Sequence, residues 1–158
     1  MNLLLVIDLQ NEFINQYSKS AINDIKTLID TNNFDQIIFT RFINDKDNPC
    51  YKIGRKWCMT KESQNICIDT KQHTVIDKRT YTAYNEELLN FINENNIQVV
   101  YLVWVDAECC VYATALNMFE NNLNIFVLKD YIYSTIWKTE KDIIIEMLKR
   151  NIWEDHVL

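Results

Sequence analysis

The amino-acid sequence predicts an α/β fold, in which an open, mainly parallel sheet is doubly wound and has helices on both faces. Apolar, β-branched runs alternate along the chain with segments whose apolar residues recur every three to four positions. The runs are continuously apolar, which is typical of strands buried on both sides of a parallel sheet. A chain of 158 residues with 48% hydrophobic residues suffices for one core, so we expect a single domain over residues 1–158.

The N-terminal half contains three expected strands and one helix. A continuous apolar run predicts a strand over residues 3–7, and helical spacing of isoleucines and leucine predicts a helix over 22–29. The β-branched run at 36–42 predicts a second strand. Residues 43–72 are polar and irregular, and a short strand is expected at 74–76. The regular elements therefore follow one another in the order that a parallel sheet requires.

The C-terminal half repeats this alternation. A helix is expected from about residue 84 to the asparagine cluster at 93–96, followed by the strongest strand, 98–105. An apolar stripe predicts the next helix over 111–119, a β-rich run predicts a strand over 124–128, and a last helix is expected around 143–148. Right-handed crossovers would bring all these strands into one sheet.

Composition excludes several classes of function. The net charge is −6 and no cationic cluster occurs, so we expect no nucleic-acid partner. The longest apolar run, 99–105, is too short to span a membrane, so no membrane partner is expected. A single glycine, Gly54, rules out glycine-rich nucleotide loops. Five cysteines without a CxxC pair favour reduced thiols and a cytoplasmic protein.

Three reactive side chains stand at or near the ends of predicted strands. Asp8 ends the first strand, Lys78 follows the strand at 74–76, and Cys110 follows the strand at 98–105. The carboxyl ends of parallel strands meet at one edge of the sheet, where such folds place their sites. A cysteine at a helix start, a lysine that favours the thiolate and an aspartate that moves protons would form a cysteine hydrolase without histidine. Taken singly, each residue has a structural alternative: a turn aspartate, a solvated lysine or a packing cysteine.

Three sequence blocks resemble the isochorismatase-like cysteine hydrolase superfamily, which includes nicotinamidases. Residues 5–13 (LVIDLQNEF) are similar to its D-x-Q-N-[DE]-F opening, and residues 77–84 (DKRTYTAY) to its K-x-x-[YF]-[ST]-A-[FY] segment. Residues 105–115 (VDAECCVYATA) are similar to the block around its nucleophile. The blocks occur in the family's order and span nearly the whole chain, which implies a Rossmann-like fold. Residues 40–44 with Trp57, and residues 128–131, resemble a bacterial-type branch of the superfamily.

The resemblance also implies roles for individual residues. Cys110 would be the nucleophile, Asp8 the base and acid, and Lys78 the cation between them, with Cys109 a spectator. A cis peptide would precede Asp106, and the backbone amides of Asp106 and Cys110 would form the oxyanion hole. Family members are usually oligomers, so a homodimer or larger homo-oligomer is expected.

Aromatic side chains near these blocks are candidates for a pocket that takes a planar small-molecule substrate, although core packing is the alternative for each one. They are Phe13, Phe42, Trp57, Tyr81 and Trp104. The nicotinamidases' D-x-H…H metal site has no counterpart in residues 43–72, where no histidine occurs. We therefore expect no metal and no cofactor, and a solvent-facing role for Asp45 and Asp47.

Two departures from the family pattern leave a second interpretation open. Trp104 stands where the family commonly has glycine, and Ala107 stands where it has threonine. The main hypothesis is hydrolysis of a small amide-type C–N bond by an Asp8–Lys78–Cys110 triad. The alternative is a catalytically weak or inactive homologue that binds a small molecule or a protein. A redox role for the adjacent Cys109 and Cys110 is weaker, because their disulfide would close a strained ring.

Overall fold

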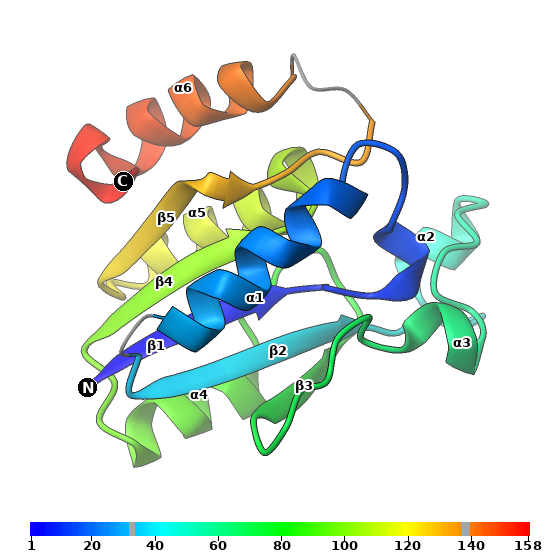
Figure 1. The fold of residues 1–158 in the computed structure, drawn as a ribbon, viewed down its shortest axis with the longest axis horizontal. Helices are drawn as coiled ribbons and strands as arrows, with labels where there is room; N and C mark the ends of the chain where they lie inside the picture. Colours follow the sequence, from blue (N-terminus) through cyan, green and yellow to red (C-terminus); the bar gives the residue numbers. More distant parts are fainter. Residues whose placement is uncertain (32–33, 137–139) are drawn as a thin grey trace.

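Five strands form one parallel sheet in the computed structural model, which describes residues 1–31, 34–136 and 140–158 (Figure 1). The order across the sheet is β3-β2-β1-β4-β5, and every neighbouring pair is parallel. The strands are β1 (Asn2–Ile7), β2 (Gln36–Phe42), β3 (Thr74–Lys78), β4 (Val99–Trp104) and β5 (Ile125–Ile132). The predicted parallel α/β sheet is confirmed.

The central strand β1 explains why its sequence is continuously apolar. Residues 3–7 are all fully buried. Leu3, Leu5 and Ile7 pack into the core on one face of the sheet, and Leu4 and Val6 pack into the core on the other. Since side chains alternate across a strand, only a strand covered on both faces needs apolar residues at every position.

Helices cover both faces of the sheet. Helix α1 (Ile22–Thr31) lies on one face and buries Ile25 and Leu28 there (Figure 1). The other face is covered by α4 (Glu86–Glu94), α5 (Tyr112–Glu120) and α6 (Glu140–Ile152), whose apolar residues join the second core. The three-to-four residue spacing seen in the sequence therefore marks the buried stripe of each helix.

The segment expected to be irregular contains two short helices. Helix α2 (Pro49–Lys52) starts at Asn48, whose side chain accepts a hydrogen bond from the Cys50 amide, and has proline at its first position. Helix α3 (Lys61–Gln64) starts with a capping box between Thr60 and Ser63. Single-turn 3₁₀ helices lie at 11–13, 19–21 and 154–156. Each piece is too short to produce a hydrophobic period, so the sequence pattern did not reveal it.

Two strands extend beyond their predicted ends. Strand β3 continues to Lys78, so this lysine is the last residue of the strand, and β5 continues to Ile132. A turn with π-helical hydrogen bonding, residues 107–111, separates β4 from α5. The chain leaves β1 and β4 toward opposite sides of the sheet, and the crevice between their carboxyl ends is where doubly wound folds bind ligands.

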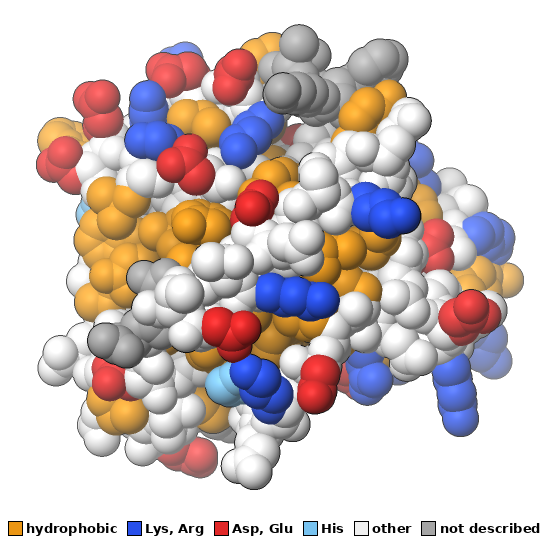
Figure 2. All heavy atoms as spheres, in the orientation of Figure 1, with side chains coloured by type: hydrophobic (Ala, Val, Ile, Leu, Met, Phe, Trp, Pro, Cys, Tyr) orange, Lys and Arg blue, Asp and Glu red, His pale blue; other side chains and the backbone are white. Residues whose placement is uncertain are grey.

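The surface carries interspersed charges. On the face drawn in Figure 2, basic and acidic side chains alternate over the helices and loops and leave apolar areas between them. Among the described residues, no helix combines the length and the apolar character needed to cross a bilayer.

Candidate active site

Asp8 lies directly after β1 and is fully buried. Its backbone has a φ of 56°, a left-handed conformation that aspartate tolerates better than most residues. Thr40 on β2 holds it twice: the Thr40 hydroxyl donates to Asp8 Oδ1 at 2.8 Å, and the Asp8 amide donates to Thr40 Oγ1 at 3.1 Å. These two bonds leave Oδ2 to face the other side chains of the site.

Lys78, at the end of β3, reaches that oxygen. Its Nζ lies 2.8 Å from Asp8 Oδ2, and the two side chains are 1% and 0% exposed. The ammonium also donates to the carbonyl oxygens of Thr80 and Tyr81, each at 2.9 Å, and lies 3.5 Å from the Sγ of Cys110. A buried ammonium surrounded by these acceptors is charge-compensated and fixed in position.

Cys110 lies in the turn that precedes α5, with only 7% of its surface exposed. Thr114, one turn further on, donates its hydroxyl to the Cys110 carbonyl at 2.6 Å and accepts the Ala83 amide at 2.9 Å. The start of α5 is thereby fastened to the segment after β3. The structure thus brings Asp8, Lys78 and Cys110 together at the carboxyl end of the sheet.

The electrostatics differ from the simple expectation that Lys78 and the helix start lower the thiol pKa. Burial and the negative charge of Asp8 raise the pKa of Cys110 well above its ordinary value, and these effects outweigh the lowering by Lys78. Burial by itself lowers the pKa of Lys78, but the charges of Asp8 and Cys110 outweigh it and the net pKa is raised. The resting site is therefore a neutral thiol beside an ion pair.

The backbone before Cys110 contains a cis peptide bond between Val105 and Asp106, as the resemblance implied. The Ala107 amide is occupied by the Tyr133 carbonyl at 2.9 Å. Within the described part of the chain, the amides of Asp106 and Cys110 donate to no residue outside the 107–111 turn. The oxyanion hole expected from these two amides stays a prediction.

A small cavity opens beside the thiol. Its walls are mainly aromatic, and it has an accessible volume of about 20 Å³, room for roughly one or two water molecules. Phe42 is buried, Phe13 and Trp57 are half-buried, and Tyr81 is exposed at the mouth. The lining residues are Phe13, Phe42, Trp57, Tyr81, Asp106, Cys109 and Cys110. Four of the five expected pocket aromatics therefore line the cavity.

Trp104, the fifth expected pocket residue, lies elsewhere. Its indole is fully buried in the core under α1, where it packs on Tyr133 with ring centroids 5.4 Å apart. Strand alternation would place it on the face of Leu102, two residues earlier, but it packs with Val103 into the core of the opposite face. Its φ of 92° is a conformation that favours glycine, which accounts for glycine at this position in the family pattern. Trp104 thus departs from the pattern without lining the cavity.

Reasoning from the sequence missed residues that hold or line the site. Thr40 orients Asp8, and Thr114 anchors Cys110. Asp106 was expected to contribute only its amide and Cys109 to be a spectator, yet both line the cavity. Thr114 stands inside the block around the nucleophile, so its position in that motif was the available signal. Thr40 is one polar residue in an apolar strand, which is a weaker signal.

The residues do not fit the metal site of the nicotinamidase pattern. Residues 43–72 contain no histidine, and the ring of His73 packs near Phe39 with centroids 6.2 Å apart. Over 1–31, 34–136 and 140–158, no three His, Cys, Asp or Glu side chains gather closely enough to hold an ion.

Solved structures with this fold include known hydrolases. The yeast nicotinamidase Pnc1p superposes with a TM-score of 0.84 at 20% identity, covering 100% of this chain and 99% of that one. An isochorismatase-like hydrolase from Alkaliphilus metalliredigens superposes with a TM-score of 0.83 at 16% identity over 95% and 91% of the two chains. N-carbamoylsarcosine amidase from Thermoplasma acidophilum gives 0.74 at 24% identity over 93% and 92%. At these identities the likeness concerns the fold.

Sequence comparisons agree with the superpositions. A 58-residue segment is 36% identical to isochorismatase family protein 2A of Dictyostelium discoideum, and spans 35% of this chain but only 29% of that protein. The model of the isochorismatase domain matches residues 2–151, which include all five strands and the three side chains gathered at their ends. This chain therefore belongs to the isochorismatase family.

Proposed function

We propose that the protein hydrolyses the C–N bond of a small amide through Cys110, with Asp8 and Lys78 as its catalytic partners. One observation carries the proposal: the ammonium of Lys78 lies 2.8 Å from Asp8 and 3.5 Å from the Cys110 sulfur, beside a cavity that this sulfur lines. A nucleophile, a proton-transferring group and a cation that contacts both are the parts that covalent acyl transfer needs.

The proposed reaction begins when Asp8 takes the proton from Cys110 Sγ. The raised pKa of the thiol makes this step necessary, because little thiolate exists at neutral pH. The thiolate adds to the substrate carbonyl carbon, and Lys78 stabilises the negative charge beside it. Asp8 then protonates the leaving nitrogen, and the C–N bond breaks to leave a thioester on Cys110. Water, deprotonated by Asp8, adds to the thioester and releases the carboxylic acid and the thiol.

The backbone supports the tetrahedral intermediates in this scheme. The amides of Asp106 and Cys110 would donate to the oxygen that becomes negative when sulfur adds to the carbonyl carbon. The π-helical turn carries Cys110 at the start of α5, where unpaired amides and the helix dipole also favour negative charge. No metal takes part in this mechanism.

Names of structural relatives support an amide substrate. Two of the superposed proteins are a nicotinamidase and an N-carbamoylsarcosine amidase, which act on an amide and on a carbamoyl compound respectively. The narrow aromatic cavity favours a small substrate with a planar group.

A panel of small amides and ureides, assayed for release of ammonia or amine, tests the proposal. Turnover of a panel member by the wild type, and its loss in Cys110→Ala, is the expected result. Turnover that survives in Cys110→Ala contradicts the nucleophile assignment. An absence of turnover across the panel favours the second candidate, an inactive homologue that binds a small molecule or protein. The departures from the family pattern at Trp104 and Ala107 support this candidate.

The proposal includes a cytoplasmic protein that forms a homodimer or a larger homo-oligomer. All five cysteines are free thiols, as a reducing compartment would keep them. The oligomeric state is measured by light scattering coupled to size-exclusion chromatography.

A further inference from the structure

The cation and the nucleophile of the site lie on segments that are distant in the sequence. The ammonium of Lys78 is held by the carbonyl oxygens of Thr80 and Tyr81, each at 2.9 Å. Two residues further along, the amide of Ala83 donates to Thr114 Oγ1 at 2.9 Å. Thr114 belongs to α5, the helix that follows the turn of the nucleophile. One side chain of this helix therefore reaches the segment that fixes the cation.

The turn that carries Cys110 is wider than an α-helical turn. The Val111 amide donates to the Asp106 carbonyl at 3.0 Å, five residues back, and the Tyr112 amide makes the next bond of this kind. An α-helix bonds four residues back, so this turn contains one residue more. If the turn closed to α-helical spacing, the side chain of Cys110 would rotate by about 100° around the helix axis. The sulfur would then leave its position 3.5 Å from the Lys78 ammonium.

Thr114 is placed to prevent this rearrangement. Its hydroxyl donates to the Cys110 carbonyl at 2.6 Å and at the same time accepts the Ala83 amide. Thr114 and Ala83 are fully buried, so bulk water does not replace a partner that is lost here. Because one oxygen serves both bonds, the turn and the segment after β3 are fixed relative to each other.

We propose that Thr114 is a positioning residue for the reaction at Cys110: its hydroxyl holds the π-helical turn against the segment after β3, and so keeps the sulfur at the Asp8–Lys78 pair. The inference rests on the proposed function, because it takes Cys110 to be the reacting thiol. Thr114 does not line the cavity, and its bond to Cys110 is to the backbone carbonyl. It therefore acts through the position of Cys110 rather than on the substrate.

Thr114→Val, which keeps the branched shape of the side chain but lacks the hydroxyl, tests the proposal through the reactivity of Cys110. Burial and the charge of Asp8 raise the pKa of this thiol more than Lys78 lowers it. A sulfur that leaves the pair should therefore regain part of its ordinary acidity. We expect iodoacetamide to alkylate Cys110 about tenfold faster or more at pH 7, since a tenfold gain in thiolate corresponds to a pKa lower by one. Peptide mass mapping separates Cys110 from Cys109.

Thr114→Ser is the matched variant. It keeps the hydroxyl and hence both hydrogen bonds, so its Cys110 should be alkylated at close to the wild-type rate. With a substrate from the amide panel, Thr114→Val should lower kcat about 100-fold and change KM little, whereas Thr114→Ser should retain most of kcat. Faster alkylation together with slower turnover indicates a thiol that is reactive but misplaced.

Ile25→Val controls for lost stability. Ile25 belongs to α1 and is fully buried on the opposite face of the sheet, so this variant weakens the core without touching the turn. It should match the wild type in both assays, and urea denaturation verifies that every variant is folded under the assay conditions. Thr114→Ala, which lacks the hydroxyl and favours a helix, replaces Thr114→Val if the latter does not fold.

Three alkylation results overturn the proposal: the wild-type rate in Thr114→Val, equal changes in Thr114→Val and Thr114→Ser, or the same change in Ile25→Val. A rise of KM alone also overturns it, because that result would place Thr114 in substrate binding. Alkylation needs no substrate, so a failed amide panel would leave this result standing.

Discussion

The ammonium of Lys78 lies 2.8 Å from the carboxylate of Asp8, and neither side chain has more than 1% of its surface exposed. Breaking such a buried pair costs more than the pair itself contributes, because one charge remains without a partner. Both charges are also needed in the proposed reaction, so the stability and the chemistry of the site depend on the same contact.

Replacing Lys78 with methionine should lower the free energy of unfolding by about 3–5 kcal/mol, since Asp8 would keep a buried, unpaired charge. Urea denaturation measures the loss. The double variant Asp8→Asn/Lys78→Met removes both charges and should recover part of the stability. If the double variant loses as much stability as Asp8→Asn and Lys78→Met together, the ion pair does not couple the two side chains.

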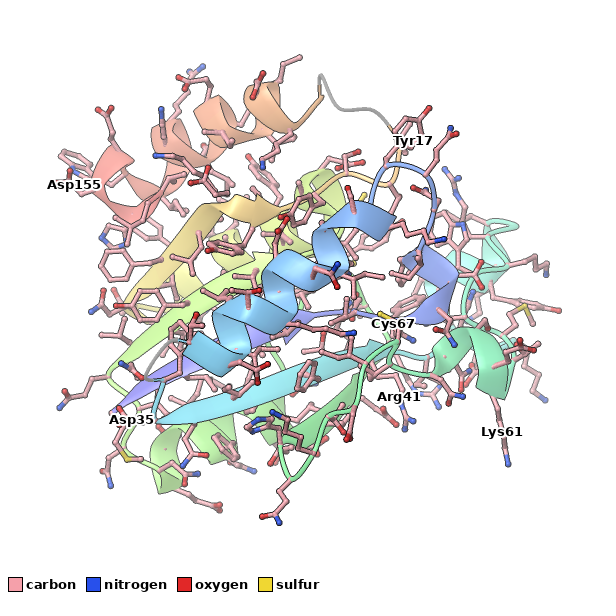
Figure 3. The ribbon with its side chains drawn as sticks, viewed as in Figure 1. Tyr17, Asp35, Arg41, Lys61, Cys67 and Asp155 are labelled. Atoms are coloured by element: carbon pink, nitrogen blue, oxygen red, sulfur yellow. The ribbon has the colours of Figure 1, made fainter. Side chains whose placement is uncertain are left out.

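Cys110→Ala should lower turnover of a substrate found in the panel by at least about 1000-fold. Cys67→Ala is the matched control, because Cys67 lies in the loop between α3 and β3 (Figure 3) and does not line the cavity. Cys109→Ala removes a cavity wall but no reacting atom, and should cost far less than Cys110→Ala. Equal losses in the two adjacent variants would contradict the assignment of the nucleophile.

Asp8→Asn should separate proton transfer from thiol reactivity. The charge of Asp8 raises the pKa of Cys110 while Lys78 lowers it, so removing Asp8 leaves the lowering effect dominant among the charges. We expect Cys110 of this variant to react faster with iodoacetamide at pH 7, while hydrolysis is lost. Peptide mass mapping identifies the labelled cysteine. Slower alkylation of Cys110 in the variant than in the wild type would contradict this electrostatic account.

Thr40→Val should lower kcat about 10- to 100-fold, because the hydroxyl that orients Asp8 Oδ1 is lost. KM should change little if Thr40 acts only through Asp8. Thr74→Val, on an exposed threonine at the start of β3, is the control. An effect on KM alone would place Thr40 in substrate binding.

Asp106→Asn should stabilise the protein at neutral pH. The pKa of Asp106 is about 6 in the folded state, against an ordinary value near 3.8, so folding opposes its ionisation. Its cost is absent below pH 4, grows between pH 4 and 6, and reaches about 3 kcal/mol above that window. Urea denaturation of both proteins from pH 4 to pH 8 should show a difference that widens as the pH rises. A constant difference would contradict the raised pKa.

The sequence predicted the sheet because its strands are buried on both faces and hence apolar at every position. The same burial made Asp8 conspicuous, since a carboxylate that ends such a run needs a reason to be there. The resemblance then supplied Lys78 and Cys110 with roles that their spacing alone left open.

Other features depend on contacts that no local pattern records. The side chain of Trp104 does not follow the alternation of β4, since it shares a face with Val103 rather than with Leu102, and its backbone has a φ of 92°. The position of Asp106 in the cavity depends on Thr135, which is 29 residues away in the chain. The helices α2 and α3 are set by caps at Asn48 and Thr60 rather than by a hydrophobic period.

The place of β3 in the sheet has a consequence for local opening. Among the described residues, this strand is the outermost on its side and pairs only with β2, so its far edge has no neighbouring strand there. Outer strands are common starting points for partial unfolding. Lys78 reaches past β2 to Asp8 at the end of the central strand, and so ties the outer strand to the middle of the sheet. Any fluctuation that detaches β3 must also remove the cation from Asp8, and amide exchange in β3 should therefore respond to substitutions at the reacting groups.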